Sequence, residues 1–188
     1  MKKTVSKILA LVDGNSSDDN ADFITNRIID GAMNLSTNII KLHYVQKLHE
    51  VFPCAGHGKC ASGKRCPIDD EFADWRDEIR DSDVIILGAT LEGGRPSVKF
   101  DRVMTRLINQ AVDLRLDGKK AILVIAGDPS DSPLFVRQKD SLVHAGMQIA
   151  AEIMYVGTSA KDDPAIIDRA HDIGSGLRTN WRQYSGKQ

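Results

Sequence analysis

The sequence predicts an α/β fold with a doubly wound, five-stranded parallel sheet in the strand order 2-1-3-4-5. Two observations lead to this prediction. Short apolar runs alternate five times with amphipathic stretches, and such alternation indicates a parallel sheet with helices on both faces. The runs are apolar throughout rather than at every second residue, which is typical of strands that are buried on both sides.

The strands are predicted from the apolar runs and the polar residues that bound them. The run "KILALV" at 7–12 is the first expected strand, and "DVIILGA" at 83–89 and "KKAILVIAG" at 119–127 show the same pattern. The other two expected strands are "TNIIKLH" at 37–43 and "IAAEIMYVG" at 149–157.

The helices are predicted from apolar residues at helical spacing and from capping residues. Ile24 and Ile28 recur at that spacing after the first strand, and Ser17 or Asp18 is the expected N-cap. Pro164 suits the first turn of the last helix. Three further helices are expected at 69–82, 97–112 and 134–148.

Composition limits the protein classes that fit. The chain has 188 residues and a net charge of −1, which suits one domain over residues 1–188 and argues against nucleic acid or an anionic membrane as partner. No apolar run approaches the ~20 residues of a membrane helix, and the first run leads into Asp and Asn, unlike a signal peptide. We therefore expect a cytoplasmic protein with reduced thiols.

Three polar loops follow the first, third and fourth expected strands. They are "DGNSSDDN" at 13–20, "ATLEGGRP" at 89–96 and "AGDPSDS" at 126–132. In an open parallel sheet, ligands bind at the carboxyl ends of the strands, where the strand order reverses. The first loop also enters a helix N-terminus, which favours an anion. The three loops together therefore predict a ligand site at one edge of the sheet.

Four stretches carry a resemblance to a known family: the first loop with its helix, "PCAGHGKCASGKRCPIDD" at 53–70, "DVIILGATLEGGRPSVKFDRVMTRL" at 83–107, and "KKAILVIAG". Over nearly all of its length the chain resembles the NAD(P)H-dependent FMN reductases, particularly their iron–sulfur flavoprotein branch. The resemblance implies a flavodoxin-like fold, FMN as cofactor, NAD(P)H as electron donor, a small-molecule or protein electron acceptor, and a homo-oligomer.

The resemblance also implies which residues contact the flavin. By position, the implied contacts fall in a phosphate loop, an isoalloxazine loop and a third loop. Those of the phosphate loop are Asn15, Ser16, Ser17 and Asn20. Those of the isoalloxazine loop are Thr90, Leu91, Glu92 and Gly93, and those of the third loop are Gly127 and Asp128.

Some residues depart from the family pattern and motivate a second hypothesis. The first loop carries Asp13, Asp18 and Asp19, whose charges oppose a phosphate. In the second loop, Glu92 takes the place of an aromatic residue that packs near the flavin in the family. The alternative is therefore a flavodoxin-like protein that has lost FMN and acts as a binding or subunit protein.

The loop at 43–68 contains all three cysteines of the chain. Its spacing, Cys54-x2-His57-x2-Cys60-x5-Cys66, offers three thiols and one imidazole as metal ligands. The resemblance implies an iron–sulfur cluster here, with His57 in place of one cysteine. A Cys3His set is also a zinc formula, and glycine-rich loops fold without metal. Iron–sulfur cluster, zinc and no metal therefore all stay open.

Overall fold

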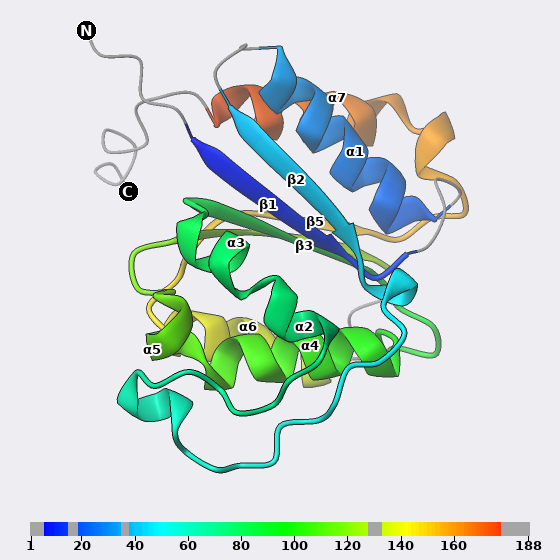
Figure 1. Cartoon of the computed structure of the whole chain (residues 1–188). Coiled ribbons are helices and arrows are strands. Elements are labelled where there is room, and N and C mark those ends of the chain that lie inside the picture. Colours follow the sequence, from blue (N-terminus) through cyan, green and yellow to red (C-terminus); the bar gives the residue numbers. More distant parts are fainter. Residues whose placement is uncertain (1–5, 15–18, 35–37, 128–132, 178–188) are drawn as a thin grey trace, which may run out of the picture.

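The computed structural model describes residues 6–14, 19–34, 38–127 and 133–177 (Figure 1). In this part of the chain, five parallel strands form one sheet in the order β2-β1-β3-β4-β5, which confirms the predicted fold class. The strands are β1 (Lys7–Val12), β2 (Ile39–Tyr44), β3 (Val84–Thr90), β4 (Lys120–Ala126) and β5 (Gln148–Tyr155).

Burial along the strands explains why they were recognisable in the sequence. β3 and β4 lie inside the sheet and are buried along almost their whole length, so each reads as a continuous apolar run. The edge strand β2 is only half-buried and mixes polar with apolar residues. It begins at Ile39, two residues after the predicted start of 37, because its weaker pattern marks its ends less sharply.

Helices cover the sheet on both faces, as Figure 1 shows. α1 (Asn20–Met33) and α7 (Pro164–Gly176) lie together on one face, and the other face is covered by the helices between β2 and β5. Each face has its own apolar core cluster. These other helices are α2 (Glu71–Asp74), α3 (Arg76–Asp81), α4 (Val98–Asn109), α5 (Ala111–Leu114) and α6 (Pro133–His144). No helix in the described ranges is long and apolar enough to span a bilayer.

Two predicted helices are each broken into two. The helix expected at 69–82 changes direction at Trp75, which ends α2 and precedes α3. The break lets the buried indole stack on the ring of His43 in β2, with 4.7 Å between ring centroids. The helix expected at 97–112 is interrupted at Gln110, whose ψ of 17° departs from helical values. Apolar spacing continues through both breaks, so it does not reveal them.

α1 and α7 approach each other closely through glycines. A Cβ on Gly174 would lie 1.9 Å from the carbonyl oxygen of Ile28, and one on Gly31 would lie 2.2 Å from that of His171. Both positions therefore exclude any side chain. Because α1 is held in this way, its N-terminus is fixed at the carboxyl edge of the sheet, where the first loop enters it.

Candidate functional site

A cavity of about 550 Å³ lies where the strand order reverses. It is lined by the first and second loops, which were expected to meet, and by the segment after β2, which was not. The described residues of the third loop, 126 and 127, are not among the lining residues. The lining residues include Asp13, Asp19, Gln46, Thr90, Glu92 and Arg95. The size is in the range of ligand and cofactor pockets, about 300–1,000 Å³.

Asp13 joins the loops that form one wall of the cavity. It follows β1, is buried, and its backbone N–H donates to the carbonyl of Gly88 on β3 at 2.8 Å. Its carboxylate accepts hydrogen bonds from the N–H of Ser97 at 2.7 Å, from the Ser97 hydroxyl, and from the amide of Gln46 at 2.8 Å. The carboxylate is therefore engaged in holding the first loop, α4 and the segment after β2 together.

Asp19 occupies the N-terminus of α1. It is the N-cap residue, in place of the predicted Ser17 or Asp18, and its carboxylate accepts the N–H of Ala21 at 2.9 Å. The Thr90 hydroxyl donates to the same oxygen. A Cβ on Gly14 would lie 3.4 Å from the other carboxylate oxygen. The helix end that was expected to favour a ligand anion therefore already holds a carboxylate of the chain itself.

The second loop is a tight turn. Glu92 and Arg95 exchange backbone hydrogen bonds of 2.9 and 3.2 Å, and the two residues between them have φ values of 57° and 75°. Positive φ at both central positions is typical of a type I′ turn and explains Gly93 and Gly94. The turn places the exposed side chains of Glu92 and Arg95 at the mouth of the cavity.

The remaining predicted flavin contacts lie elsewhere or outside the described residues. Leu91 is buried and packs on Gly127, where a Cβ would come within 3.0 Å of the leucine Cβ. Asn20 turns toward the segment before α7, because its side-chain oxygen accepts the N–H of Ala160 at 2.8 Å. The predicted contacts Asn15, Ser16, Ser17 and Asp128 fall outside the described residues, as does the acidic Asp18, which was not a predicted contact.

Sequence reasoning missed a buried carboxyl group in the helix that follows the first loop. Asp22 lies in the first turn of α1 with no exposed surface. Burial raises the pKa of its carboxyl, and the nearby Asp19 adds to the rise. Burial and the Asp22 carboxyl also raise the pKa of Tyr44 at the end of β2. An aspartate in a helix first turn is usually a dipole or capping residue, so the sequence held no signal for its burial.

The four predicted metal ligands are not brought together. No group of three or more His, Cys, Asp or Glu side chains in the described ranges is arranged to hold a metal ion, and all four candidates lie within those ranges. Cys60 is buried in the short turn Cys60–Ser62, whereas His57 is exposed between Gly56 and Gly58, whose φ values are 69° and 68°. The geometry therefore does not support the expected iron–sulfur cluster, or zinc.

Cys60 is nevertheless close enough to the other two cysteines for their charges to act on it. Burial raises the pKa of the Cys60 thiol, and the neighbouring Cys66 and Cys54 add to the rise. A raised pKa disfavours the thiolate, which is the form that binds metals. The three cysteines are free. The turn that contains Cys60 packs on α5, where a Cβ on Gly63 would lie 3.5 Å from a methyl group of Val112.

Basic side chains of α4 hold the start of the cysteine loop. Lys99 donates to the carbonyl of Leu48 at 2.5 Å, Arg102 donates to that of Val51 at 3.0 Å, and Arg106 donates to that of Phe52 at 3.4 Å. These three residues recur along α4 at spacings of three and four, so they lie on one face of the helix. Together they fasten residues 48–52 to α4 without any metal.

Asp70 completes this anchor. It caps α2, accepts the N–H of Phe52 at 2.9 Å, and forms an ion pair with Arg106 in which both side chains are only 1% exposed. The guanidinium also lies over the ring of Phe72, 4.8 Å from its centroid. The sequence showed Asp70 only as the start of a helix.

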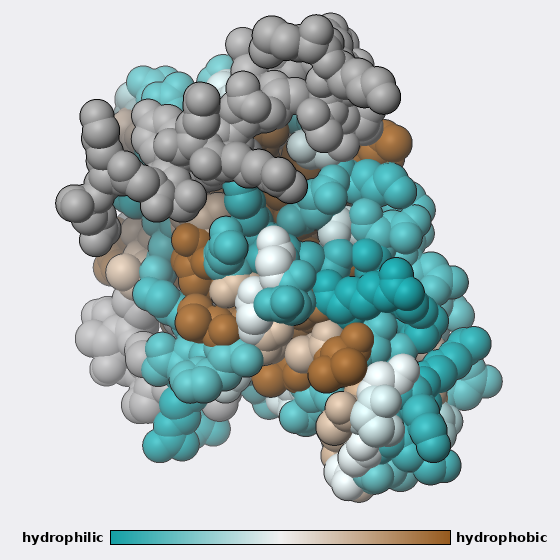
Figure 2. Space-filling view, turned by 90° about the vertical axis from the view of Figure 1, so that its left-hand side faces the viewer, coloured by the Kyte–Doolittle hydropathy of each residue, from teal (hydrophilic) through white to brown (hydrophobic). Residues whose placement is uncertain are grey.

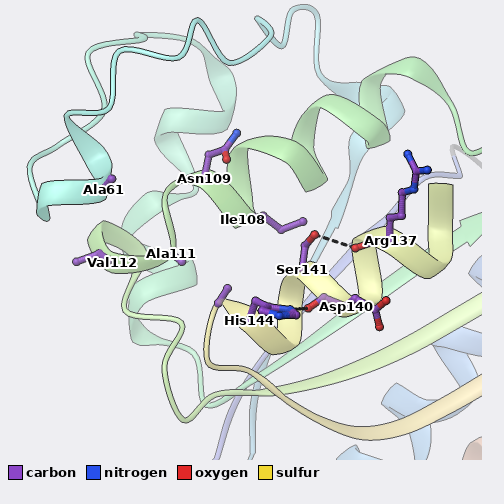
Figure 3. Close-up of a pocket in the computed structure, with 10 residues that line it drawn as sticks. Ala61, Ile108, Asn109, Ala111, Val112, Arg137, Asp140, Ser141 and His144 are labelled. Atoms are coloured by element: carbon purple, nitrogen blue, oxygen red, sulfur yellow. Dashed lines mark hydrogen bonds between the residues drawn. The ribbon is translucent and has the colours of Figure 1, made fainter.

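Two other cavities are less suited to binding a ligand, because several of their polar groups are bonded within the chain. One of about 690 Å³ lies between the Cys60 turn, α5 and α6 (Figure 3). Its hydroxyl and imidazole groups bond to their own helix: Ser141 donates to the carbonyl of Arg137 at 2.8 Å, and His144 contacts that of Asp140 at 2.7 Å. Neither group is held toward a ligand.

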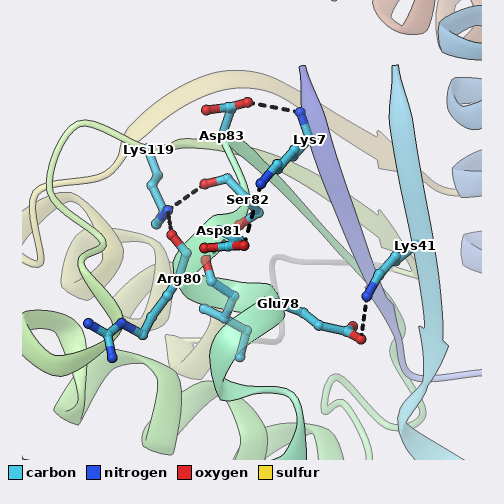
Figure 4. Close-up of polar contacts among 9 residues, drawn as sticks. Lys7, Lys41, Glu78, Arg80, Asp81, Ser82, Asp83 and Lys119 are labelled. Carbon is cyan, nitrogen blue, oxygen red and sulfur yellow. Dashed lines mark hydrogen bonds and ion pairs between the residues drawn. The ribbon is translucent and has the colours of Figure 1, made fainter. Parts of the chain in front are cut away.

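The other hollow, of about 340 Å³, lies at the amino ends of the strands, beside α3 (Figure 4). Lys7 pairs with Asp81 at 3.4 Å and Lys41 with Glu78 at 2.6 Å at its rim. Nearby, Lys119 caps α3 by donating to the Arg80 carbonyl at 2.8 Å, and burial lowers its pKa. Figure 2 shows this end of the molecule as small hydrophobic groups among hydrophilic residues.

Comparison with known proteins supports the fold. No family model matches the sequence, and no curated protein matches it. Solved structures do match, among them an azoreductase from Bacillus anthracis str. Sterne, with a TM-score of 0.67 and 13% identity over 92% of this chain and 100% of that one.

Two other solved structures show the same similarity. A flavodoxin from Streptococcus pneumonia TIGR4 has a TM-score of 0.56 and 17% identity, covering 93% of this chain and 97% of that one. An FMN-dependent NADH-azoreductase from Bacillus anthracis str. Ames Ancestor, in complex with FMN, has a TM-score of 0.57 and 11% identity, covering 91% of this chain and 96% of that one. At such identities the likeness shows the fold alone, and that fold is flavodoxin-like.

Proposed function

We propose that this chain is a flavin-dependent oxidoreductase or electron-transfer flavoprotein, similar to the NAD(P)H-dependent FMN reductases, with its flavin ring in the switch-point cavity. The observation that carries the proposal is the cavity itself. Loops that are far apart in the sequence converge there on the carboxyl edge of the sheet, which is the ligand-binding edge of open α/β folds. Solved structures with this fold include flavin-dependent oxidoreductases.

The residues present fit the ring part of a flavin. Pro96 and the exposed Val98 offer an apolar wall. The Glu92–Arg95 turn contains two glycines, so its backbone is open to close approach by a planar ring. Thus the second loop would hold and orient the isoalloxazine.

The described residues that line the cavity do not fit the phosphate of FMN. Among the described residues that line the cavity, Arg95 is the sole cation, against the carboxylates of Asp13, Asp19 and Glu92. The N–H of Ala21, in the first turn of α1, is already bonded to the Asp19 carboxylate. A phosphate at this helix end would displace one carboxylate and face another.

The flavin, when bound, supplies the two-electron chemistry, so no catalytic side-chain dyad is required. The role of the protein chain would be to hold the isoalloxazine ring and to shield one side of it from solvent. NAD(P)H as donor, a small-molecule or protein acceptor, and assembly as a homo-oligomer belong to this proposal through the family resemblance.

A second candidate function is that of a flavodoxin-like protein without flavin, acting as a binding or subunit protein. The carboxylates that occupy the phosphate end of the cavity favour it. Such a lining suits a cation or a polar neutral ligand better than an anion.

Flavin titration separates the two candidates. Purified protein is added to riboflavin and to FMN in turn, and the change in flavin fluorescence gives the dissociation constants. Saturable binding in the micromolar range, together with NADH or NADPH oxidation that depends on added flavin, is expected of the oxidoreductase. No binding of either flavin at about 100 μM protein, an affinity weaker than about 5 kcal/mol, would exclude it and leave the second function.

A further inference from the structure

We infer that Asp19 makes the switch-point site select riboflavin, a flavin without phosphate, over FMN. This inference rests on the proposed function and names its ligand more closely. It is carried by the disagreement between the phosphate group and the residues that stand at the N-terminus of α1.

Hydrogen-bond donors that a phosphate would need are already bonded within the chain. A phosphate at a helix N-terminus binds the free N–H groups of the first turn. Here the N–H of Ala21 is 2.9 Å from the Asp19 carboxylate, and the Thr90 hydroxyl donates to that carboxylate as well. Across the cavity, the N–H of Ser97 is bonded to Asp13 at 2.7 Å. Two donors at the N-terminus of α1 and one across the cavity are therefore engaged by the chain's own carboxylates.

The negative charge at the N-terminus of α1 also disfavours a phosphate. Helix N-termini attract anions because their dipole is positive there, and in this chain the Asp19 side chain offsets that dipole. A phosphate monoester adds up to two negative charges beside it. Riboflavin ends instead in a ribityl hydroxyl, which donates hydrogen bonds to carboxylates and adds no charge. The same lining that repels a phosphate therefore suits the tail of an uncharged flavin.

The test uses a substitution that changes charge alone. Asp19→Asn keeps a side-chain oxygen to accept the N–H of Ala21 and the Thr90 hydroxyl, and Asn is as good an N-cap as Asp. Asp30→Asn is the matched control, because Asp30 lies at the other end of α1 in a surface pair with Arg27. Dissociation constants for riboflavin and FMN are measured with the wild type and both variants at low salt.

We expect the wild type to bind riboflavin about tenfold more tightly than FMN, because Coulomb repulsion between the FMN phosphate and the Asp19 carboxylate weakens FMN binding. Asp19→Asn should remove most of that preference by strengthening FMN binding alone, and Asp30→Asn should leave it unchanged. The preference should also shrink as salt is raised, because salt screens the repulsion.

Other results would overturn the inference in distinguishable ways. Wild-type protein that binds FMN as tightly as riboflavin, or Asp19→Asn protein that gains equally for both flavins, would refute the role of Asp19 and leave the proposed function standing. A preference that does not depend on salt would refute the electrostatic cause. If neither flavin binds to the wild type or to the Asp19→Asn variant, the proposed function fails together with the inference.

Discussion

The buried pair of Asp70 and Arg106 is the strongest test of how the cysteine loop is held. Both side chains are 1% exposed, and Asp70 also accepts the N–H groups of Phe52 and Ala73. Arg106 is less well satisfied, because two of its guanidinium nitrogens have no hydrogen-bond partner among the described residues. The two partners are therefore not equivalent, and removing one should differ from removing the other.

Removing one member of a buried ion pair costs about 3–5 kcal/mol, because a buried charge is left uncompensated. Asp70→Asn leaves an arginine that cannot lose its proton, so we expect a loss near the upper end of that range. Arg106→Met leaves Asp70 with two backbone donors, and we expect a loss of about 3 kcal/mol. The double variant should lose about 2–3 kcal/mol less than the sum of the single losses.

The assay is urea unfolding followed by circular dichroism and by tryptophan fluorescence, with the free energy of unfolding compared among the variants. Asp81→Asn is the control, because Asp81 belongs to an exposed pair with Lys7 and should change stability by less than about 1 kcal/mol. The pair does not anchor the loop if Asp70→Asn lowers the free energy of unfolding by no more than Asp81→Asn does. The same holds if the losses of the two single variants add up to the loss of the double variant.

Three further predictions follow from other parts of the fold. Gly174→Ala should destabilise by about 1–3 kcal/mol because its Cβ meets the Ile28 carbonyl, whereas Gly176→Ala, with open space around it, should not lower the melting temperature. Burial raises the pKa of Asp22, so the folded state holds a proton that the unfolded state releases near pH 4; the free energy of unfolding should fall as pH rises above that value, and Asp22→Asn should flatten this slope on the alkaline side of pH 4. A chelator should leave the melting temperature within about 1 °C of its starting value, because side chains of α4 and Asp70 hold the cysteine loop; a larger fall would show that a metal contributes.

The sheet could be predicted closely because each strand's sequence reflects its own burial. Residues 84–89 are buried on both faces, so their apolar composition alone is enough to predict the strand. The helix breaks at Trp75 and Gln110 could not be predicted, since the apolar spacing is the same on both sides of each break. What turns the chain at Trp75 is the packing of its ring on His43 in another element.

The site could be predicted as a place but not as a set of contacts. Topology alone brings the first and second loops to one edge of the sheet, and the cavity lies there. The bonds between Asp13 and Ser97 join residues that are 84 positions apart, and nothing local to either residue indicates its partner. Asp19 could be named as an unfavourable charge, but its bond to Thr90 depends on how closely the two loops approach.

The cysteine loop shows how spacing can mislead. A ligand pattern counts residues, whereas coordination depends on the directions of the side chains. In this loop, Gly56 and Gly58 both adopt positive φ, and His57 between them is exposed. Cys60 is instead buried in a turn that packs on α5. The cysteine and histidine spacing resembles a cluster-binding segment, but the glycines between these residues let the backbone follow a course that the spacing does not indicate.

One helix connects the two regions that the sequence singled out. At its N-terminus, α4 is joined to the cavity, because its cap Ser97 donates to the Asp13 carboxylate. Along one face, Lys99 and Arg106 hold the start of the cysteine loop. The wall of the cavity and residues 48–52 are therefore held by the same helix. The loop therefore has a physical connection to the cavity that requires no metal, and this makes its anchoring by Asp70 and Arg106 relevant to the site.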